Sequence, residues 1–329
     1  MGAWKKELFL VEKHISKKKT VFSNPLLWLF VIPLLMFGVG RLYFRVTDGF
    51  RIAHISSDFT FDPRWETRQL SHKEQATVDE ILSQDFTYLG KGCQSYVFLS
   101  EDGEHVIKFL KYQRFRPQFY FYWLSFIPAV ENSLNYRLKK KKFKRENLFR
   151  SWRTAFDNLP EETGLVYVHL NKTSHLDKQL TIYDKVGLKY TLNIDDMEFL
   201  IQKKATMICP MLDTMMAEGK EKEAKTILSE LIQMVTSEYH RGFADNDHAL
   251  MQNTGVYHGK PIHVDVGQFV KDDAMRDPSL YYQELFNKTW KFRVWLKEKH
   301  PDLLAHIDQE LLNEMGEEFY TIQFIPKER

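Results

Sequence analysis

The residues best suited to chemistry form two groups that lie about 150 positions apart in the chain. The first is a glycine turn, LGKGCQSYV over residues 89–97, followed by Lys108 in the apolar run HVIKF. The second is YHRGFADNDHALMQN over residues 239–253, followed by HVDVG over residues 263–267. Glycines allow backbone N–H groups to come close to a ligand, and the second group supplies several carboxylates and an amide.

The first group resembles the ATP-binding strands of the protein-kinase superfamily. In that family a G-x-G-x-x-G-x-V loop covers the phosphates, and a lysine on the third strand holds them. Gly90, Gly92 and Val97 match the loop, whereas Ser95 replaces its third glycine. Lys108 follows Gly90 by eighteen residues and resembles the lysine of V-A-I-K. The resemblance implies that Gly90, Gly92, Ser95, Val97 and Lys108 bind ATP.

The second group resembles the catalytic segments of the same superfamily, in which H-R-D-L-x-x-x-N precedes D-F-G. His240 and Arg241 match the beginning, Asn253 matches the asparagine, and Asp265 begins a D-V-G. The resemblance implies that Asn253 and Asp265 hold Mg²⁺ through oxygen ligands. It covers roughly residues 86–269, with the motifs in the family's order.

The catalytic loop departs from the family pattern. Gly242 stands where the catalytic aspartate follows His-Arg, and Asp245 and Asp247 come three and five residues later. The family interval from aspartate to asparagine is five residues, whereas here it is eight from Asp245 or six from Asp247. We expect one of these two aspartates to accept the proton of the phosphate acceptor, with Asp245 preferred and Asp247 second.

A kinase lysine also needs an acidic partner on a helix. Glu146 is the favoured candidate because it begins a helix whose residues Trp152, Ala155, Phe156 and Leu159 form one apolar face. Glu131 is the alternative, and an exposed structural role suits either carboxylate.

The resemblance implies a phosphotransferase that uses ATP and Mg²⁺ on an unknown acceptor. No A-P-E follows, and only 64 residues remain after Asp265, which indicates a reduced C-terminal lobe and an atypical kinase. Two alternatives stay open. One is a nucleotide-binding pseudokinase that acts as a scaffold or regulatory module with a protein partner. The other is a lipid-surface protein in which the motif matches are accidental.

The elements that would position these residues change in type along the chain. A capping-box pattern at Ser71 predicts a helix from about Glu74 to Ser83. Strands are expected over 86–89, 95–99, 105–110, 164–170, 180–183, 189–194 and 198–203, and on both sides of Gly259. Helices are expected up to about Leu159, from Asp213 and from Ser279. This order predicts an α+β fold with two lobes, the first rich in strands and the second mostly helical.

The N-terminal region contains a candidate membrane segment. Residues 25–40, PLLWLFVIPLLMFGVG, carry no charge, and as a helix they reach about 24 Å against a hydrocarbon core of about 30 Å. Lysines before the segment and Arg41, Arg45 and Arg51 after it make both flanks basic. A single span and a hairpin kinked at Pro33 both fit. The positive-inside rule places the larger domain outside in a single span, whereas ATP supply favours the cytoplasmic side.

The predicted organisation has five parts. They are a basic segment (1–23), the membrane segment (24–44), a linker with one short strand (45–70), a first lobe (71–209) and a second lobe (210–329). The basic run Lys139–Arg145 predicts either contact with anionic membrane lipid or a solvated loop. Nucleic acid is disfavoured, because the net charge is only +2 and no binding motif accompanies the run. Two cysteines and scattered histidines argue against a zinc site.

Overall fold

The computed structural model describes residues 25–325, and the chain divides into two compact units, residues 1–50 and 51–329. The predicted basic segment 1–23 lies outside the described residues. Within the first unit, α2 spans Pro25–Thr47 as one continuous helix that passes through Pro33. Its 23 residues correspond to about 34 Å, because each residue adds 1.5 Å.

The helix α2 is longer than the uncharged run suggested, since it continues past Arg41. The part of the helix over Leu27–Thr47 is long and apolar enough to span a membrane. A hairpin kinked at Pro33 is not the conformation observed, because residues on both sides of the proline belong to the same helix.

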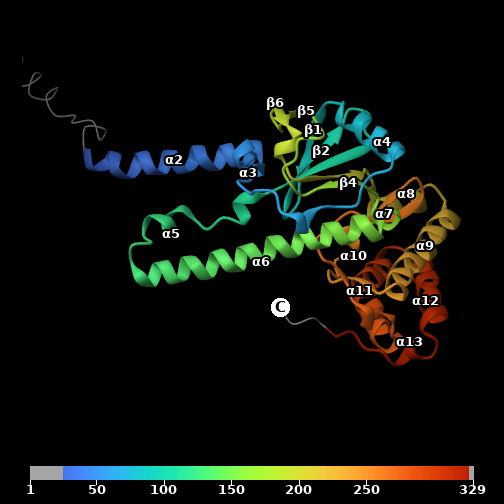
Figure 1. Ribbon diagram of the computed structural model, residues 1–329. Helices are drawn as coiled ribbons and strands as arrows, with labels where there is room; N and C mark the ends of the chain where they lie inside the picture. The colour runs from blue at the N-terminus through green and yellow to red at the C-terminus, as the bar shows by residue number, and fades with distance from the viewer. Residues whose placement is uncertain (1–24, 326–329) are drawn as a thin grey trace, which may run out of the picture. The chain divides into compact units, whose positions relative to one another are not determined.

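The second unit contains a curled seven-stranded sheet with strand order β4-β7-β3-β2-β1-β5-β6 (Figure 1). All neighbours are antiparallel except β1 and β5, which pair in parallel. The seven strands confirm the predicted set; they are β1 (Phe86–Lys91), β2 (Ser95–Ser100), β3 (His105–Leu110), β4 (Leu165–His169), β5 (Gln179–Tyr183), β6 (Lys189–Asn193) and β7 (Phe199–Lys203).

The central strands are held by an aromatic row on the buried face of the sheet. Side chains of β2 alternate between partly exposed and buried, as expected when one face packs on a core. Phe98, Phe109 and Phe199 lie on three neighbouring strands, with ring centroids 5.9 and 6.1 Å apart. Such aromatic pairs stabilise a sheet beyond the area that they bury.

Two segments before the sheet pack against it. The predicted capping box is present: Ser71 accepts from the Glu74 N–H and Glu74 accepts from the Ser71 N–H, which begins α4 (His72–Leu82). The expected linker is not an open connection from residue 51 onward. It forms α3 (Ile52–Ile55) and the short helix η2 (Pro63–Trp65), without the expected strand, and the ring of Trp65 contacts Phe149 edge-on at 5.4 Å.

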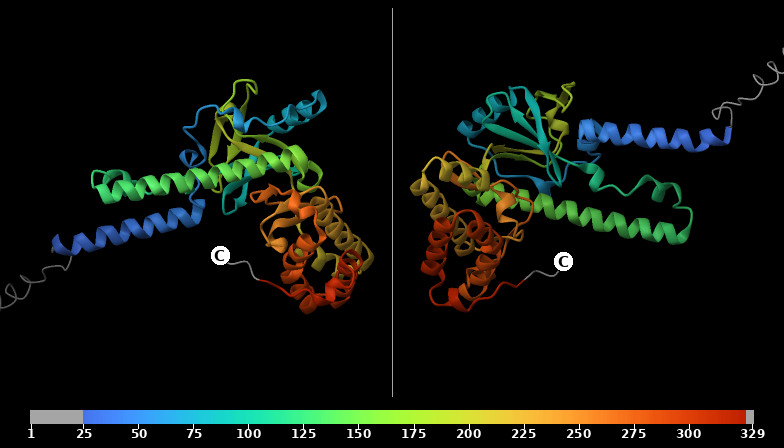
Figure 2. Two further views of the ribbon diagram at one scale, coloured as in Figure 1. Left: turned by 60° about the horizontal axis from the view of Figure 1, so that its bottom comes forward. Right: turned by 180° about the vertical axis from the view of Figure 1, so that it is seen from behind.

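The longest helix of the second unit is α6 (Pro128–Asn158), which lies between the sheet and the C-terminal helices (Figure 2). It begins well before the expected start near residue 145, so the basic run Lys139–Arg145 is helical rather than a loop. The short helix α5 (Phe119–Trp123) lies beside its N-terminal half. Smaller helices nearby are η3 (Tyr112–Arg114), α7 (Pro160–Thr163) and η4 (Ile194–Asp196).

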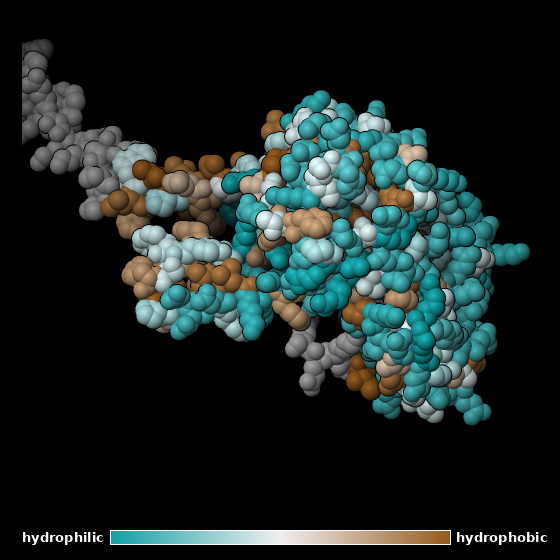
Figure 3. Space-filling model, viewed as in Figure 1, coloured by the Kyte–Doolittle hydropathy of each residue, from teal (hydrophilic) through white to brown (hydrophobic). Residues whose placement is uncertain are grey.

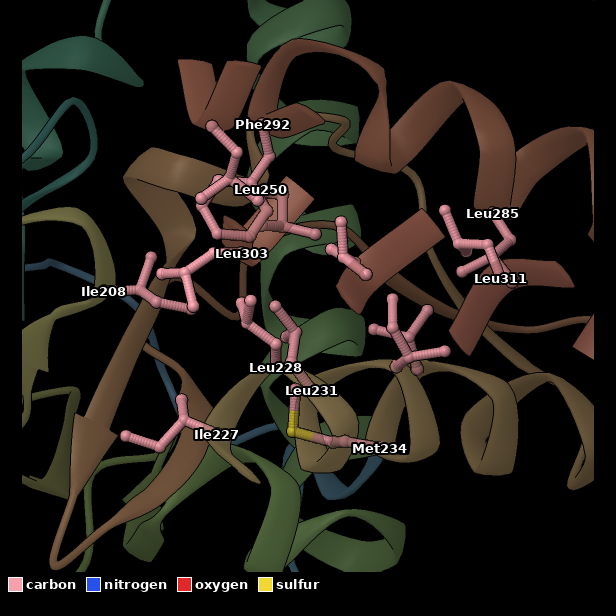
Figure 4. Packing of buried hydrophobic residues seen from close by; sticks show 14 of the residues in the cluster. Ile208, Ile227, Leu228, Leu231, Met234, Leu250, Leu285, Phe292, Leu303 and Leu311 are labelled. Atoms are coloured by element: carbon pink, nitrogen blue, oxygen red, sulfur yellow. The ribbon is translucent and has the colours of Figure 1, made fainter. Parts of the chain in front are cut away.

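The C-terminal part is mostly helical, as expected. Its apolar core joins four helices and includes Ile208, Leu228, Leu231, Leu285 and Leu311 (Figure 4). The helices are α8 (Ile208–Ala217), α9 (Glu221–His240), α11 (Pro278–Lys299) and α12 (Pro301–Met315), with the short α10 (Leu250–Asn253), η5 (Asp273–Arg276) and α13 (Glu318–Thr321).

Two small sheets lie between the large sheet and these helices. The predicted hairpin around Gly259 is present as β10 (Thr254–Tyr257) and β11 (Lys260–His263), and β8 (Thr206–Met207) pairs with β10. The turn places His258 and Gly259 at φ values of 46° and 81°, which suits a two-residue hairpin. The second sheet pairs β9 (Phe243–Asp245) with β12 (Phe269–Lys271).

Candidate functional site

A cavity of about 290 Å³ brings the two predicted groups of residues together. Strands of the large sheet supply Leu89, Val97, Val106, Lys108 and Leu200 to its wall. Asn253, Val264 and Asp265 also line the cavity, and Asn253 lies 145 positions after Lys108 in the chain. A mostly apolar wall with a few convergent polar groups is typical of a small-molecule site.

Lys108 lies on β3 and is partly buried in this cavity. Its ammonium group donates a hydrogen bond to the backbone carbonyl of Val264. Burial lowers the pKa of Lys108 to about 8, because desolvation disfavours the charged form, and the nearby charge of Asp265 acts in the opposite direction. The lysine therefore lies where an anionic ligand would gain a strong electrostatic interaction.

The glycine turn between β1 and β2 lies over one end of the cavity. Gly92, Ser95 and Val97 line the cavity, whereas Gly90 does not. A Cβ atom added at Gly90 would meet open space. Two basic side chains donate hydrogen bonds to carbonyls of the turn: the ammonium group of Lys111 to Gly92, and the guanidinium of Arg114 to Cys93. The motif did not reveal these two basic residues, because they follow the strand rather than the turn.

Asn253 and Asp265 supply polar groups to the same cavity. Asn253 ends α10 and is 8% exposed, and its Nδ2 atom has no hydrogen-bond partner among the described residues. Asp265 is exposed, and its Oδ1 atom accepts from the Gly267 N–H at 3.0 Å. An amide with an unsatisfied buried atom beside an exposed carboxylate is a donor set suited to Mg²⁺, because the amide oxygen and nitrogen exchange places by a flip.

Within residues 25–325, no three His, Cys, Asp or Glu side chains lie close enough together to hold a metal ion by themselves. Magnesium ions commonly use one or two carboxylates and complete their coordination with phosphates and water. The residues present therefore fit a metal that enters with a phosphorylated ligand.

The structure separates the two candidate aspartates by environment. Asp245 ends β9, is 4% exposed, and forms a buried ion pair with Lys288 of α11 at 3.1 Å. Its other oxygen accepts from the Asp247 N–H at 3.1 Å. Asp247 is partly exposed, and its Oδ1 atom accepts from the Ala249 N–H, which orders the loop before α10. Neither aspartate lines the cavity. The buried ion pair with Lys288 leaves Asp245 less free than Asp247 to accept a proton, and which of the two acts as base stays a prediction.

The expected pair between Lys108 and Glu146 is not formed. Glu146 accepts from Arg64 at 3.2 Å, on a different face of α6 from the cavity. The α6 residues that line the cavity are Leu148 and Trp152, four positions apart on one face. The alternative, Glu131, is exposed in the first turn of α6, about 25 Å along the helix from Leu148.

Ser151 is a site residue that the sequence did not indicate. Its hydroxyl, buried in α6, donates to the Val266 carbonyl at 2.7 Å and accepts from the Phe269 N–H at 2.6 Å. These bonds attach the Asp265–Gly267 segment to α6. Serine within a helix gives no pattern from which this contact could be predicted, because its partners lie 115 and 118 positions away.

The chain matches no protein-family model and no curated protein. Among solved structures it is similar to WbdD. The alignment with a 2.2 Å crystal structure of WbdD covers 66% of this chain and 43% of the WbdD chain, with 16% identity and a TM-score of 0.32. A structure described as the bifunctional kinase-methyltransferase WbdD covers 66% and 42%, with 15% identity and a TM-score of 0.32.

A co-crystal structure of WbdD with the kinase inhibitor LY294002 covers 68% of this chain and 45% of that chain, with 16% identity and a TM-score of 0.31. The chain therefore spans less than half the length of the WbdD chains. Likeness at these TM-scores establishes neither a family nor an activity for this chain.

Proposed function

We propose that the chain is a membrane-attached atypical kinase, which transfers a phosphoryl group from ATP to an acceptor hydroxyl with the help of Mg²⁺. The observation that carries this proposal is the convergence of Lys108, Asn253 and Asp265 on one cavity beside a glycine turn. That three residues from two distant parts of the chain line one cavity supports the roles that the family resemblance gives them.

The apolar part of the cavity suits the adenine base. Leu89, Val97, Val106 and Leu200 offer apolar surface, and residues 203–205 also line the cavity. With the base there, Gly92 and Ser95 would lie over the phosphates and Lys108 would pair with them. Binding of phosphates would favour the charged form of Lys108, which burial otherwise disfavours.

Asn253 and Asp265 are the residues that would hold Mg²⁺. Bound there, the metal would neutralise charge on the phosphates during transfer. We assign Asp247 as the base, because Asp245 is occupied by Lys288. The acceptor oxygen forms a bond to the γ-phosphorus, its proton moves to Asp247, and the bond to ADP breaks.

One observation favours a second candidate, a nucleotide-binding pseudokinase. Within the described residues, no α6 carboxylate reaches Lys108, and Leu148 and Trp152 occupy that side of the cavity. In active kinases the lysine is oriented by such a carboxylate. A protein with this cavity and without the pair could bind ATP and serve as a scaffold.

Release of phosphate from ATP to water separates the two candidates, because it needs no knowledge of the acceptor. The full chain in lipid nanodiscs is compared with Asp247→Asn. For a kinase we expect ATP binding to persist in this variant while turnover falls by about 10²–10⁴, the usual contribution of a general base. Binding without turnover in the unaltered chain, across candidate acceptors as well as water, would leave only the pseudokinase.

A further inference from the structure

The helices α5 and α6 form a protrusion from the sheet (Figure 1), and its surface mixes hydrophobic and hydrophilic residues (Figure 3). Five large aromatics on it are between 61% and 81% exposed: Phe119, Trp123, Phe126, Tyr136 and Phe143. Single exposed apolar residues are ordinary, but a group of this size marks an interaction surface.

The aromatic residues follow helical spacing. Phe119 and Trp123 are four positions apart on α5, Phe126 lies in the turn that follows, and Tyr136 and Phe143 are seven positions apart on α6. On α6 the exposed face is opposite the side that carries buried Leu134 and Leu148. Positions three and four apart share a face, so Lys139 and Lys140 lie beside Tyr136 and Phe143.

The charge of the protrusion is strongly one-sided. Residues 114–145 contain nine Lys and Arg residues and one acid, Glu131, which gives a net charge of +8 against +2 for the whole chain. Within residues 25–325, no salt bridge joins Lys139, Lys140, Lys142 or Lys144 to an acidic side chain. These exposed lysines therefore leave the surface strongly positive and available to pair with an anionic partner.

Side-chain contacts fix α6 of the protrusion to α5 and to the segment before α5. The ammonium group of Lys141 donates to the carbonyls of Arg114 and Arg116, both at 2.7 Å, and the guanidinium of Arg137 lies 4.4 Å from the ring of Phe121. These contacts join α6 to α5 and the segment before it. The exposed aromatics therefore belong to an ordered surface that a partner meets already formed.

We propose that the outer surface of the α5–α6 protrusion binds the interface of an anionic lipid bilayer. Aromatic rings that enter the headgroup region, flanked by lysines that pair with lipid phosphates, are the combination that peripheral amphipathic helices use. The occupant is a membrane because the same chain carries α2, a helix long and apolar enough to span one. The inference does not depend on kinase activity.

The test places an environment-sensitive NBD dye on the full chain, because α2 would bring even an inactive variant to vesicles. Cys93 and Cys209 are replaced by serine, and Phe126→Cys carries the dye. The chain is reconstituted in vesicles of phosphatidylcholine alone or with phosphatidylglycerol. We expect a blue shift and protection from aqueous iodide in the anionic vesicles, and neither at the control position Gln309→Cys on α12.

A charge-reversal series provides the matched control. Changing Lys139, Lys140, Lys142 and Lys144 to Glu should abolish the blue shift. Changing four exposed lysines elsewhere, Lys222, Lys291, Lys297 and Lys299, to Glu should leave it intact. Equal melting temperatures of the two variants show that both fold.

Three results would overturn the inference. A dye at position 126 that stays accessible to iodide in anionic vesicles excludes lipid contact. A shift that is equal in neutral vesicles and grows with protein density indicates a second copy of this chain. A shift that appears only when RNA is added indicates a nucleic-acid surface instead.

Discussion

The ammonium group of Lys108 donates a hydrogen bond to the carbonyl of Val264, the residue directly before Asp265. The bond crosses the cavity and joins β3 of the large sheet to the segment that follows β11. Lys108 is desolvated there, and its pKa of about 8 records that the positive charge lacks full compensation. The position is costly for stability and suited to an anion, as expected of a functional site.

Replacement of Lys108 by methionine should therefore stabilise the protein without ligand while removing its ATP binding. Methionine keeps the length of the side chain and removes a charge whose burial is unfavourable. We expect the free energy of unfolding to rise by about 1–2 kcal/mol, since one pKa unit corresponds to about 1.36 kcal/mol and partial exposure reduces the effect. Chemical denaturation measures this, with exposed Lys260→Met as the control. Loss of stability in Lys108→Met would contradict the account.

The two aspartates of the loop should respond differently to the same change. Asp245→Asn leaves the buried ammonium of Lys288 without its charge partner, and we expect a loss of about 3–5 kcal/mol. Asp247→Asn should fold normally and lose turnover. The double variant Asp245→Leu with Lys288→Met should recover much of the stability. A stable, inactive Asp245→Asn would instead return the base to Asp245.

Ser151→Ala should loosen the segment that carries Asp265. The substitution removes the acceptor of the Phe269 N–H, which is buried, so we expect a cost of about 1–3 kcal/mol. Hydrogen exchange of residues 265–269 should increase more than exchange in β10. Ser229→Ala, which removes a hydroxyl that bonds Glu310 away from the cavity, is the control. Unchanged exchange at residue 269 would contradict the assignment.

His169 should make the fold sensitive to mild acid. Burial lowers its pKa to about 4, and its Nδ1 atom lies 2.7 Å from the Met197 carbonyl oxygen. The unfolded chain takes up the proton near pH 6.5, and the folded chain does so only near pH 4. Stability should therefore be complete above pH 6.5 and decrease as the pH falls from 6.5 to 4.

The measurement is the urea midpoint at several pH values for the unaltered chain and for His169→Asn, which keeps a side-chain donor. The difference in urea midpoint between the unaltered chain and His169→Asn should become smaller as the pH falls from 6.5 to 4. Parallel curves would show that His169 does not control the acid response. Carboxylates titrate in both proteins and cancel in the difference.

Local signals predicted much of the fold. The capping box at Ser71, the three strands around the glycine turn and the hairpin at Gly259 each depend on neighbouring residues, so their patterns are visible in sequence. The start of α6 was not visible, because its N-terminal half is exposed and carries no apolar period. The parallel pairing of β1 with β5 joins residues 96 positions apart and has no local signal.

Sequence motifs predicted which residues of distant segments belong to one site, because each motif fixes the position of its residues within a strand or loop. Lys108, Asn253 and Asp265 line one cavity, and the roles that the resemblance gives them stay predictions. Glu146 failed as a partner because the rotation of α6 about its axis depends on tertiary packing, which turned Leu148 and Trp152 to the cavity instead. The choice between Asp245 and Asp247 depends on Lys288, which lies 43 positions after Asp245 on another helix.

The most direct test of the kinase-type site is thermal melting of the full chain in detergent with ATP, with and without Mg²⁺. A ligand bound only by the folded state at 100 times its Kd adds about 2.7 kcal/mol to stability. We predict a rise in melting temperature that requires Mg²⁺ and disappears in Lys108→Met and Asp265→Asn, while Lys260→Met behaves as the unaltered chain. No rise at saturating ATP in a folded sample, or a rise that survives both variants, would contradict the proposed site.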